Sequence, residues 1–329
     1  MYKIPGILFT AALAIPAWFL GKLIPIVGSP ILGILIGMLL AGWKRPAVLD
    51  DGIQYTSKKL LQYSIILLGF DMNLFNVFIV GRQTITLMTF TLMAVFLTAF
   101  VIGKALKIDG KTSTLVGVGT AICGGSAIAA TAPVINANDS NVAHSISTIF
   151  LFNVIAAFLF PFLGHVLGMD DQNFGFWAGT AINDTSSVVA AGYAFSHAAG
   201  NLAVIVKLTR TLMIVPVTLV LAGYTSRKVM CKGSAREKNN YSITKIFPWF
   251  VVGFVVASII NTFVSMPQGT GELLAQTGKF VIVMAMIAIG INTNVVQLVK
   301  SGAKPILMGL ICWIVLAATS LAIQYTISS

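Results

Sequence analysis

Two stretches of the sequence decide the fold: GTAICGGSAIAA at positions 119–130 and GTAINDTSSVVA at positions 179–190. They align without a gap at an offset of 60. The first contains Gly124 and Gly125, a pair that favours a break in a helix. The second contains five consecutive polar residues, which hydrocarbon tolerates only where they line a polar cavity. We interpret both as broken or re-entrant segments of a duplicated unit, covering about 112–137 and 174–198; chance similarity between small-residue helices is the alternative.

Long apolar runs fill the rest of the 329-residue chain, which is 57% hydrophobic and only 9% charged, with a mean hydropathy of +0.91. This composition excludes a soluble enzyme. The runs are continuous rather than alternating, which excludes a transmembrane β-barrel. We predict an all-α polytopic membrane protein, a single transmembrane domain over residues 1–329 with about 9 to 11 transmembrane helices. The runs cover 5–26, 29–43, 60–75, 84–103, 112–136, 141–166, 174–197, 200–224, 246–264, 278–296 and 303–326.

Charge indicates the orientation. The chain has 21 Lys and Arg against 10 Asp and Glu, a net charge of +11, and most of the cations fall in loops that can share one side. By the positive-inside rule we expect that side, with the N-terminus and the loop 225–245, to be cytoplasmic, and the C-terminus to lie outside a bacterial inner membrane. The acidic loop around Asp170 then faces outward. The cations are explained by topology, so we expect no nucleic-acid partner.

A second internal similarity pairs IILLGFDMN at 65–73 with MIAIGINTN at 286–294, at an offset of 221. With the first pair it gives two pairs of equivalent elements, and we expect an inverted-repeat core plus a scaffold. The polar residues that end these spans are secondary candidates for substrate contact, and helix capping explains them equally well. They are Asp71, Asn73, Asn292 and Asn294.

The expected chemistry concentrates at the two breaks. Exposed N–H groups at the start of a helix suit an anion, so we predict a substrate site that also includes the deepest cation, Arg210. The predicted substrate-binding residues are Cys123, Gly124, Gly125, Ser126, Asn183, Thr185, Ser186 and Arg210. Lys207, three residues before Arg210 and nearer the span end, is a secondary candidate that we expect to extend to the membrane interface.

Asp184 is the acidic residue placed deepest in an apolar run. With Ser187 it is our candidate for binding a coupling ion, H⁺ or Na⁺, since hydroxyl and carboxylate oxygens suit sodium. A structural pair with Lys207 or Arg210 is the alternative. The cysteines have no metal-site spacing, so no metal other than Na⁺ near Asp184 and no cofactor is expected. His144, His165 and His197 lie near span ends, where solvation is the expected role.

Several stretches together carry a family resemblance: LVGVGTAICGGSAIAATAPVI, AINDTSSVVAAGYAF, LLGFDMNL, IGINTNV and KLTRTLMIVP. Over nearly the whole chain they resemble the YeiH family of sulfate exporters, within the superfamily of cation/proton antiporters, bile-acid symporters and 2-hydroxycarboxylate transporters. The resemblance implies a core of broken or crossing helices, an elevator-like mechanism and a homodimer.

Together the residues and the resemblance predict a secondary active transporter rather than an enzyme. We expect it to export a small inorganic or sulfur-containing anion, such as sulfate or sulfite, coupled to H⁺ or Na⁺. An organic-anion transporter or a cation/proton antiporter of the same fold is the main alternative. An ion channel is a further alternative, although paired unlike segments fit alternating access better. The chain has no phosphate-binding GxxxxGK[ST] loop for ATP.

Overall fold

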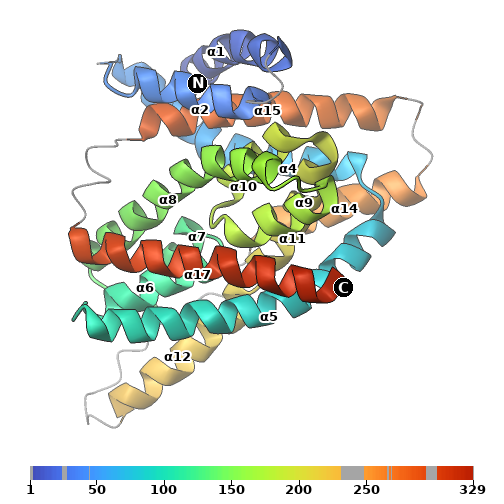
Figure 1. Cartoon of the computed structure of the whole chain (residues 1–329). Helices are drawn as coiled ribbons and strands as arrows, with labels where there is room; N and C mark the ends of the chain where they lie inside the picture. Colours follow the sequence, from blue (N-terminus) through green and yellow to red (C-terminus); the bar gives the residue numbers. More distant parts are fainter. Residues whose placement is uncertain are drawn as a thin grey trace.

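The fold is described from a computed structural model, which covers residues 3–23, 28–43, 45–230, 248–264, 267, 269–293 and 302–328. These residues form helices joined by turns and short loops (Figure 1). The helices are α1 (Ile4–Leu23), α2 (Gly28–Leu40), α3 (Asp50–Tyr55), α4 (Leu61–Leu68), α5 (Leu74–Ala105), α6 (Gly110–Ala121), α7 (Gly125–Thr131), α8 (Asp139–Val166), α9 (Asp171–Ala181), α10 (Thr185–Phe195), α11 (His197–Thr211), α12 (Ile214–Met230), α14 (Trp249–Phe263), α15 (Thr270–Asn292) and α17 (Ala303–Ser328).

Six helical stretches in the described part of the chain are long and apolar enough to cross a bilayer. They are Ile4–Gly21, Leu74–Ala105, Ser140–Val166, His197–Thr225, Thr270–Asn292 and Ala303–Thr326. Shorter apolar helices lie at Ser29–Leu40 and Trp249–Phe263. The predicted all-α polytopic class is therefore confirmed. Some boundaries were wrong. α15 begins at Thr270, eight residues before the predicted run, and α5 begins at Leu74, ten residues before the predicted run, where Asn73 caps its first turn by accepting from the Phe75 N–H at 2.8 Å.

Helices α1, α2, α4, α14 and α15 pack into one group, which we call the α15 unit. α15 runs along α2 and α4, and α1 covers α2 and α15. Small residues allow these close approaches: a Cβ at Gly37 would lie 2.9 Å from the Cα of Gly290. In Figure 1, α1, α2 and α15 form the upper layer of the molecule.

Helices α5 to α12 and α17 form the second group, which we call the hairpin unit. Within it α6 and α7 make hairpin 1. Lys111 Nζ, near the start of α6, donates to the carbonyl of Asn136, just beyond α7, at 2.5 Å. Asn141 Nδ2, in the first turn of α8, donates at 2.9 Å to Asp109, the N-cap of α6. Hairpin 1 therefore enters and leaves the bundle at the same end.

Helices α9 and α10 make hairpin 2, which also returns to the end from which it starts. Phe174, in the first turn of α9, stacks on Phe195, the last residue of α10, with ring centroids 3.9 Å apart. His165, at the end of α8, also stacks on Phe195, with ring centroids 4.4 Å apart. α8 has 28 residues, about 40 Å of helix, and joins the open ends of the two hairpins. The hairpins thus enter from opposite ends of the bundle.

The two ends carry opposite charge. The open end of hairpin 1 adjoins Lys104, Lys107 and Lys111, and we call this the basic end. The open end of hairpin 2 adjoins Asp170 and Asp171, and we call this the acidic end. In Figure 1 α5, α15 and α17 run across the view between these ends, with the basic end on the left and the C-terminus on the right.

The two units meet along a seam where α10 packs on α2. Ile34 of α2 belongs to the same buried apolar cluster as Val189 and Ala190 of α10, and Met286 of α15 joins it. The contact between α2 and α10 is therefore apolar.

Candidate functional site: the hairpin tips

The two hairpin tips are short breaks at equivalent positions of the repeated sequence. α6 ends at Ala121 and α7 begins at Gly125; α9 ends at Ala181 and α10 begins at Thr185. Gly124 has φ +68°, a conformation that costs other residues strain energy, so the first turn requires glycine. A Cβ at Gly124 would lie 3.4 Å from the Cβ of Asp184. The two tips are therefore in contact.

Lys207, on α11, joins the tips. Its side chain is 0% exposed, and its Nζ donates to the Ile122 carbonyl at 3.0 Å and to the Ile182 carbonyl at 2.7 Å. Both carbonyls follow the last residue of a helix, where partial negative charge accumulates and lone pairs are unsatisfied. The expectation that Lys207 extends to the interface is wrong, because these two helix ends give its ammonium partners inside the protein.

Arg210 lies one turn further along the same face of α11 and is also fully buried. Its Nε donates to the Ala121 carbonyl at 2.6 Å and its Nη2 to the Thr120 carbonyl at 3.1 Å. Its Nη1 has no hydrogen-bond partner among the described residues. Two of the three guanidinium nitrogens are thus used to hold hairpin 1, and one remains for another ligand.

Asp184 caps α10 at the tip of hairpin 2. Its carboxylate accepts from the Ser186 backbone N–H at 3.1 Å and also from the Ser186 hydroxyl. Its own N–H donates to Asn153 Oδ1 of α8 at 3.2 Å. The carboxylate also interacts electrostatically with Lys207. Asp184 is therefore held at the point where the tips, α8 and α11 meet.

Unsatisfied polar atoms gather at the same place. Apart from the Thr131 hydroxyl, the buried side-chain atoms that lack a partner within the described chain belong to residues of the tips or their immediate neighbours. They are Thr120 Oγ1, Asn153 Nδ2, Asn183 Nδ2, Asn183 Oδ1 and Arg210 Nη1. Buried polar groups without partners are rare and destabilising, so such a concentration is typical of a ligand site.

The remaining predicted residues take different positions. Cys123 is 2% exposed at the tip of hairpin 1, and Thr185, Ser186 and Ser187 are buried at the start of α10. Gly125 is half-buried, whereas the side chain of Ser126 is exposed at the surface of α7. The structure thus gathers the hairpin 2 residues at the tips and leaves Ser126 outside the buried cluster.

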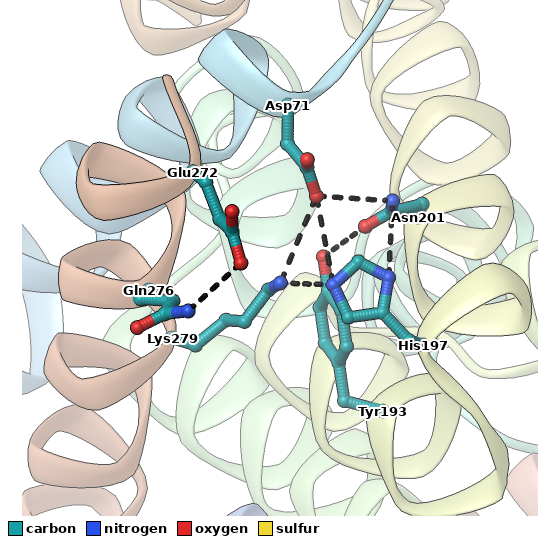
Figure 2. A network of polar contacts seen from close by, with 7 residues as sticks. All are labelled: Asp71, Tyr193, His197, Asn201, Glu272, Gln276 and Lys279. Carbon is teal, nitrogen blue, oxygen red and sulfur yellow. Dashed lines mark hydrogen bonds and ion pairs between the residues drawn. The ribbon is translucent and has the colours of Figure 1, made fainter. Parts of the chain in front are cut away.

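A second polar cluster lies at the acidic end, on the side of the molecule where α15 faces α11 (Figure 2). Asp71 Oδ2 lies 3.6 Å from Lys279 Nζ and 3.5 Å from His197 Nε2. Lys279 Nζ also contacts His197 Nε2. Asn201 Nδ2 is 3.5 Å from the Asp71 carboxylate, and its Oδ1 accepts from the Tyr193 hydroxyl at 2.6 Å. Through these contacts the hairpin unit is linked to the α15 unit.

The other secondary candidates act as structural groups. Asn73 is the N-cap of α5. Asn292, at the basic end of α15, accepts from Arg45 Nη2 at 3.1 Å, and Asn294 lies outside the described residues. Asp71 and Asn292 therefore occupy opposite ends of the bundle, and the described residues of the two sequence-paired segments do not form a shared site.

Three residues at the two clusters were missed from the sequence: Asn153, His197 and Lys279. Asn153 is a lone amide in the apolar run of α8, and a buried polar residue in a transmembrane helix is itself a signal of function. His197 was assigned to solvation because it follows a span end. Lys279 had no special signal, since its partner Asp71 is distant in sequence.

The family and relatives of the chain agree with a membrane protein. The family model described as "Conserved hypothetical protein 698" matches residues 5–309. A UPF0324 membrane protein of Streptococcus pyogenes serotype M18 is 47% identical, with 99% of this chain and 97% of the relative covered. Relatives of the same description in Fusobacterium nucleatum and Streptococcus mutans are 45% and 46% identical, each covering 98% of this chain and 97% of the relative. No solved structure matches the chain significantly.

Proposed function

The chain belongs to the family described as conserved hypothetical protein 698, together with the UPF0324 membrane proteins, and from this premise we propose that it is a secondary active transporter of a small anion. One observation carries the proposal. Two re-entrant hairpins from opposite ends of the bundle meet tip to tip around buried polar atoms that have no partner among the described residues. Irregular backbone at membrane depth is favourable only where it lines a polar cavity or is buried in protein, and such a site can be reached from either side in turn.

The charge of the tips favours an anion. Two cations, Lys207 and Arg210, stand against one carboxylate, Asp184. Arg210 Nη1 and the amide nitrogens of Asn153 and Asn183 are donors that have no acceptor in the part of the chain that the structure describes. An oxyanion supplies several acceptor oxygens at once. The YeiH-like sequence features make an inorganic or sulfur-containing oxyanion, such as sulfate or sulfite, the first substrate to test.

Asp184 is the proposed site of the coupling ion. Its carboxylate accepts from Ser186 in the present arrangement, and the buried hydroxyls of Thr185 and Ser187 adjoin it in sequence. A proton or Na⁺ on this carboxylate would compete with the capping bonds of α10. Binding of the ion would thereby loosen or reorder the tip of hairpin 2, which couples the ion to the substrate site.

The proposed movement is an elevator-like displacement of the hairpin unit against the α15 unit. The part of the seam where α10 packs on α2 is apolar, so sliding would break polar contacts between the units mainly at the cluster of Asp71, Lys279 and His197. With the basic end in the cytoplasm, hairpin 1 opens inward and hairpin 2 outward. The homodimer implied by the sequence resemblance would hold the scaffold still.

Flux into liposomes tests the proposal. The purified protein is reconstituted, and uptake of labelled sulfate and sulfite is measured while Na⁺ and proton gradients are imposed separately. Uptake that follows one gradient is expected, and Asp184→Asn should abolish its dependence on that gradient. Current through single open pores would instead indicate a channel, and gradient-independent uptake by wild type would contradict coupling.

An organic anion is the second candidate substrate, because the sequence resemblance extends to a superfamily that includes 2-hydroxycarboxylate transporters, and a carboxylate offers acceptor oxygens to Arg210 Nη1 as an inorganic oxyanion does. The same flux assay with organic acids competing against labelled sulfite separates the two candidates. A cation/proton antiporter receives less support, since Asp184 is the only carboxylate among the described residues of the tips.

A further inference from the structure

A cavity of about 300 Å³ opens where the acidic end of the seam lies between the two units. One wall comes from the end of α1 and the start of α2, another from the turn between α10 and α11, and the floor from α15. The residues that carry the argument are Trp18, Ser29, Tyr193, Ser196, His197 and Lys279. This site is separate from the hairpin tips, which do not line it.

Among the described residues, this cavity is lined by one charged side chain, that of Lys279, and by the imidazole of His197. Lys279 and His197 face it, and no acidic residue is among its described lining residues. Asp71 and Glu272 instead line a neighbouring cavity of about 490 Å³. Figure 2 shows how the separation arises: Lys279 and His197 both contact the Asp71 carboxylate, which approaches them from the α4–α5 turn. The contacts of Asp71 with Lys279 and His197 thus separate the two cavities, with the basic residues lining one cavity and Asp71 lining the other.

The remaining lining is apolar and aromatic. Tyr193 lies beneath Lys279, whose Nζ is 6.0 Å from the ring centroid. Trp18 packs edge-on against Phe280, the residue after Lys279, with ring centroids 5.8 Å apart, and Ile282 and Val283 complete the apolar surface. A pocket of this kind, mostly apolar with one or two fixed charges, is typical of sites for small organic molecules, and its volume lies at the small end of that class.

We propose that this cavity binds a small organic carboxylate with an aromatic or branched apolar body. The carboxylate would pair with the Lys279 ammonium, with His197 beside it, and the body would lie between Trp18 and Tyr193. The inference goes beyond transport at the hairpin tips and does not depend on it, because none of these residues belongs to the tips.

Because Lys279 already pairs with Asp71, binding of a carboxylate ligand should depend on both residues. Its ammonium now pairs with Asp71, which adjoins α4, while His197 and Asn201 hold the same carboxylate from α11. A bound carboxylate competes with Asp71 for Lys279. Removing the Asp71 charge should therefore strengthen ligand binding, whereas removing the Lys279 charge should weaken it. If Asp71 and Lys279 served only to hold the two units together, removing their charges would not change ligand affinity in opposite directions.

Equilibrium binding of labelled phenylacetate to the purified full chain in detergent tests the proposal, with neutral phenylacetamide as the matched probe. Wild type should bind phenylacetate saturably and at least about tenfold more tightly than the amide, a difference of about 1.4 kcal/mol. Lys279→Gln should abolish that preference, Lys279→Arg should retain it, and Asp71→Asn should increase affinity. Lys304→Gln, which removes an exposed cation elsewhere, should change nothing.

Several results would overturn the proposal: no saturable binding to wild type, equal binding of phenylacetamide, or an equal effect of Lys279→Gln and Lys304→Gln. Folding of each variant is checked by its elution profile and melting temperature. If Lys279→Gln does not fold, Trp18→Leu replaces it, and unchanged phenylacetate affinity in that variant would count against the site. Phenylacetate binding and sulfite flux are measured separately, so failure of one leaves the other assignment standing.

Discussion

At the scale of single residues, Lys207 and Arg210 show what the sequence can and cannot indicate. Their spacing of three correctly places both on one face of α11. Their partners are four backbone carbonyls at the ends of α6 and α9, and a backbone carbonyl has no signature in a sequence. Arg210 lies at the hairpin tips, where most of its guanidinium is used to hold hairpin 1, and its role in substrate binding stays a prediction.

Removing the charge of Lys207 should destabilise the protein strongly. In Lys207→Met the Ile122 and Ile182 carbonyls lose their only described donor while remaining buried at negative helix ends. We expect a loss of about 3 kcal/mol, the range for breaking a buried charged interaction. The melting temperature in detergent measures it. Lys104→Met, at an exposed position, is the control, and equal melting of the two variants would show that the carbonyl contacts contribute little.

At the scale of elements, the sequence predicted the two interrupted segments at 112–137 and 174–198 from glycine pairs and polar runs. It left open whether they cross the membrane or return. That choice depends on contacts between residues far apart in the chain, such as Lys111 with Asn136. The two sequence similarities are also nested, with 65–73 before hairpin 1 and 286–294 after hairpin 2. A single tandem duplication would explain only one of them.

The return of both hairpins can be tested by labelling single cysteines in a chain whose native cysteines are replaced. Lys104→Cys and Ser140→Cys flank hairpin 1, and Gln172→Cys and Ala198→Cys flank hairpin 2; all four positions are exposed. A membrane-impermeant maleimide should label the first pair from one side of oriented vesicles and the second pair from the other. If the members of either pair reacted from opposite sides, that segment would be a full crossing.

The break at Gly124 should be required for transport beyond its effect on stability. Gly124→Ala and Gly168→Ala both place a side chain at positive φ, +68° and +61°, and each should cost about 1 to 3 kcal/mol of strain, with the larger cost at Gly124 because its ψ of −130° lies outside the left-handed helical region. Only at Gly124 does the new Cβ meet Asp184 and Asn153; at Gly168 nothing lies within 4 Å. Anion flux should fall at least about tenfold in Gly124→Ala and persist in Gly168→Ala. Equal flux in the two variants would show that the tip of hairpin 1 is not required for transport.

At the scale of the whole molecule, composition and hydrophobic runs were enough to predict the all-α membrane class, because the bilayer imposes length and polarity on every crossing segment. The arrangement of the two units could not be predicted from the sequence. The contacts between Asp71, Lys279 and His197 join three segments that are distant in sequence. Asp71 and His197 are more than a hundred residues apart, and His197 and Lys279 are about eighty apart. No local pattern indicates such contacts.

Transport at the hairpin tips is the central claim, and labelled sulfite flux in liposomes with Asn183→Ala tests it most directly. Both polar atoms of the Asn183 amide are buried without a partner in the described structure, so its removal should leave the melting temperature unchanged or higher. We predict that Asn183→Ala loses gradient-driven flux while Gly168→Ala retains it. Flux equal to wild type in a folded Asn183→Ala protein would contradict the assignment of the transport site to the hairpin tips.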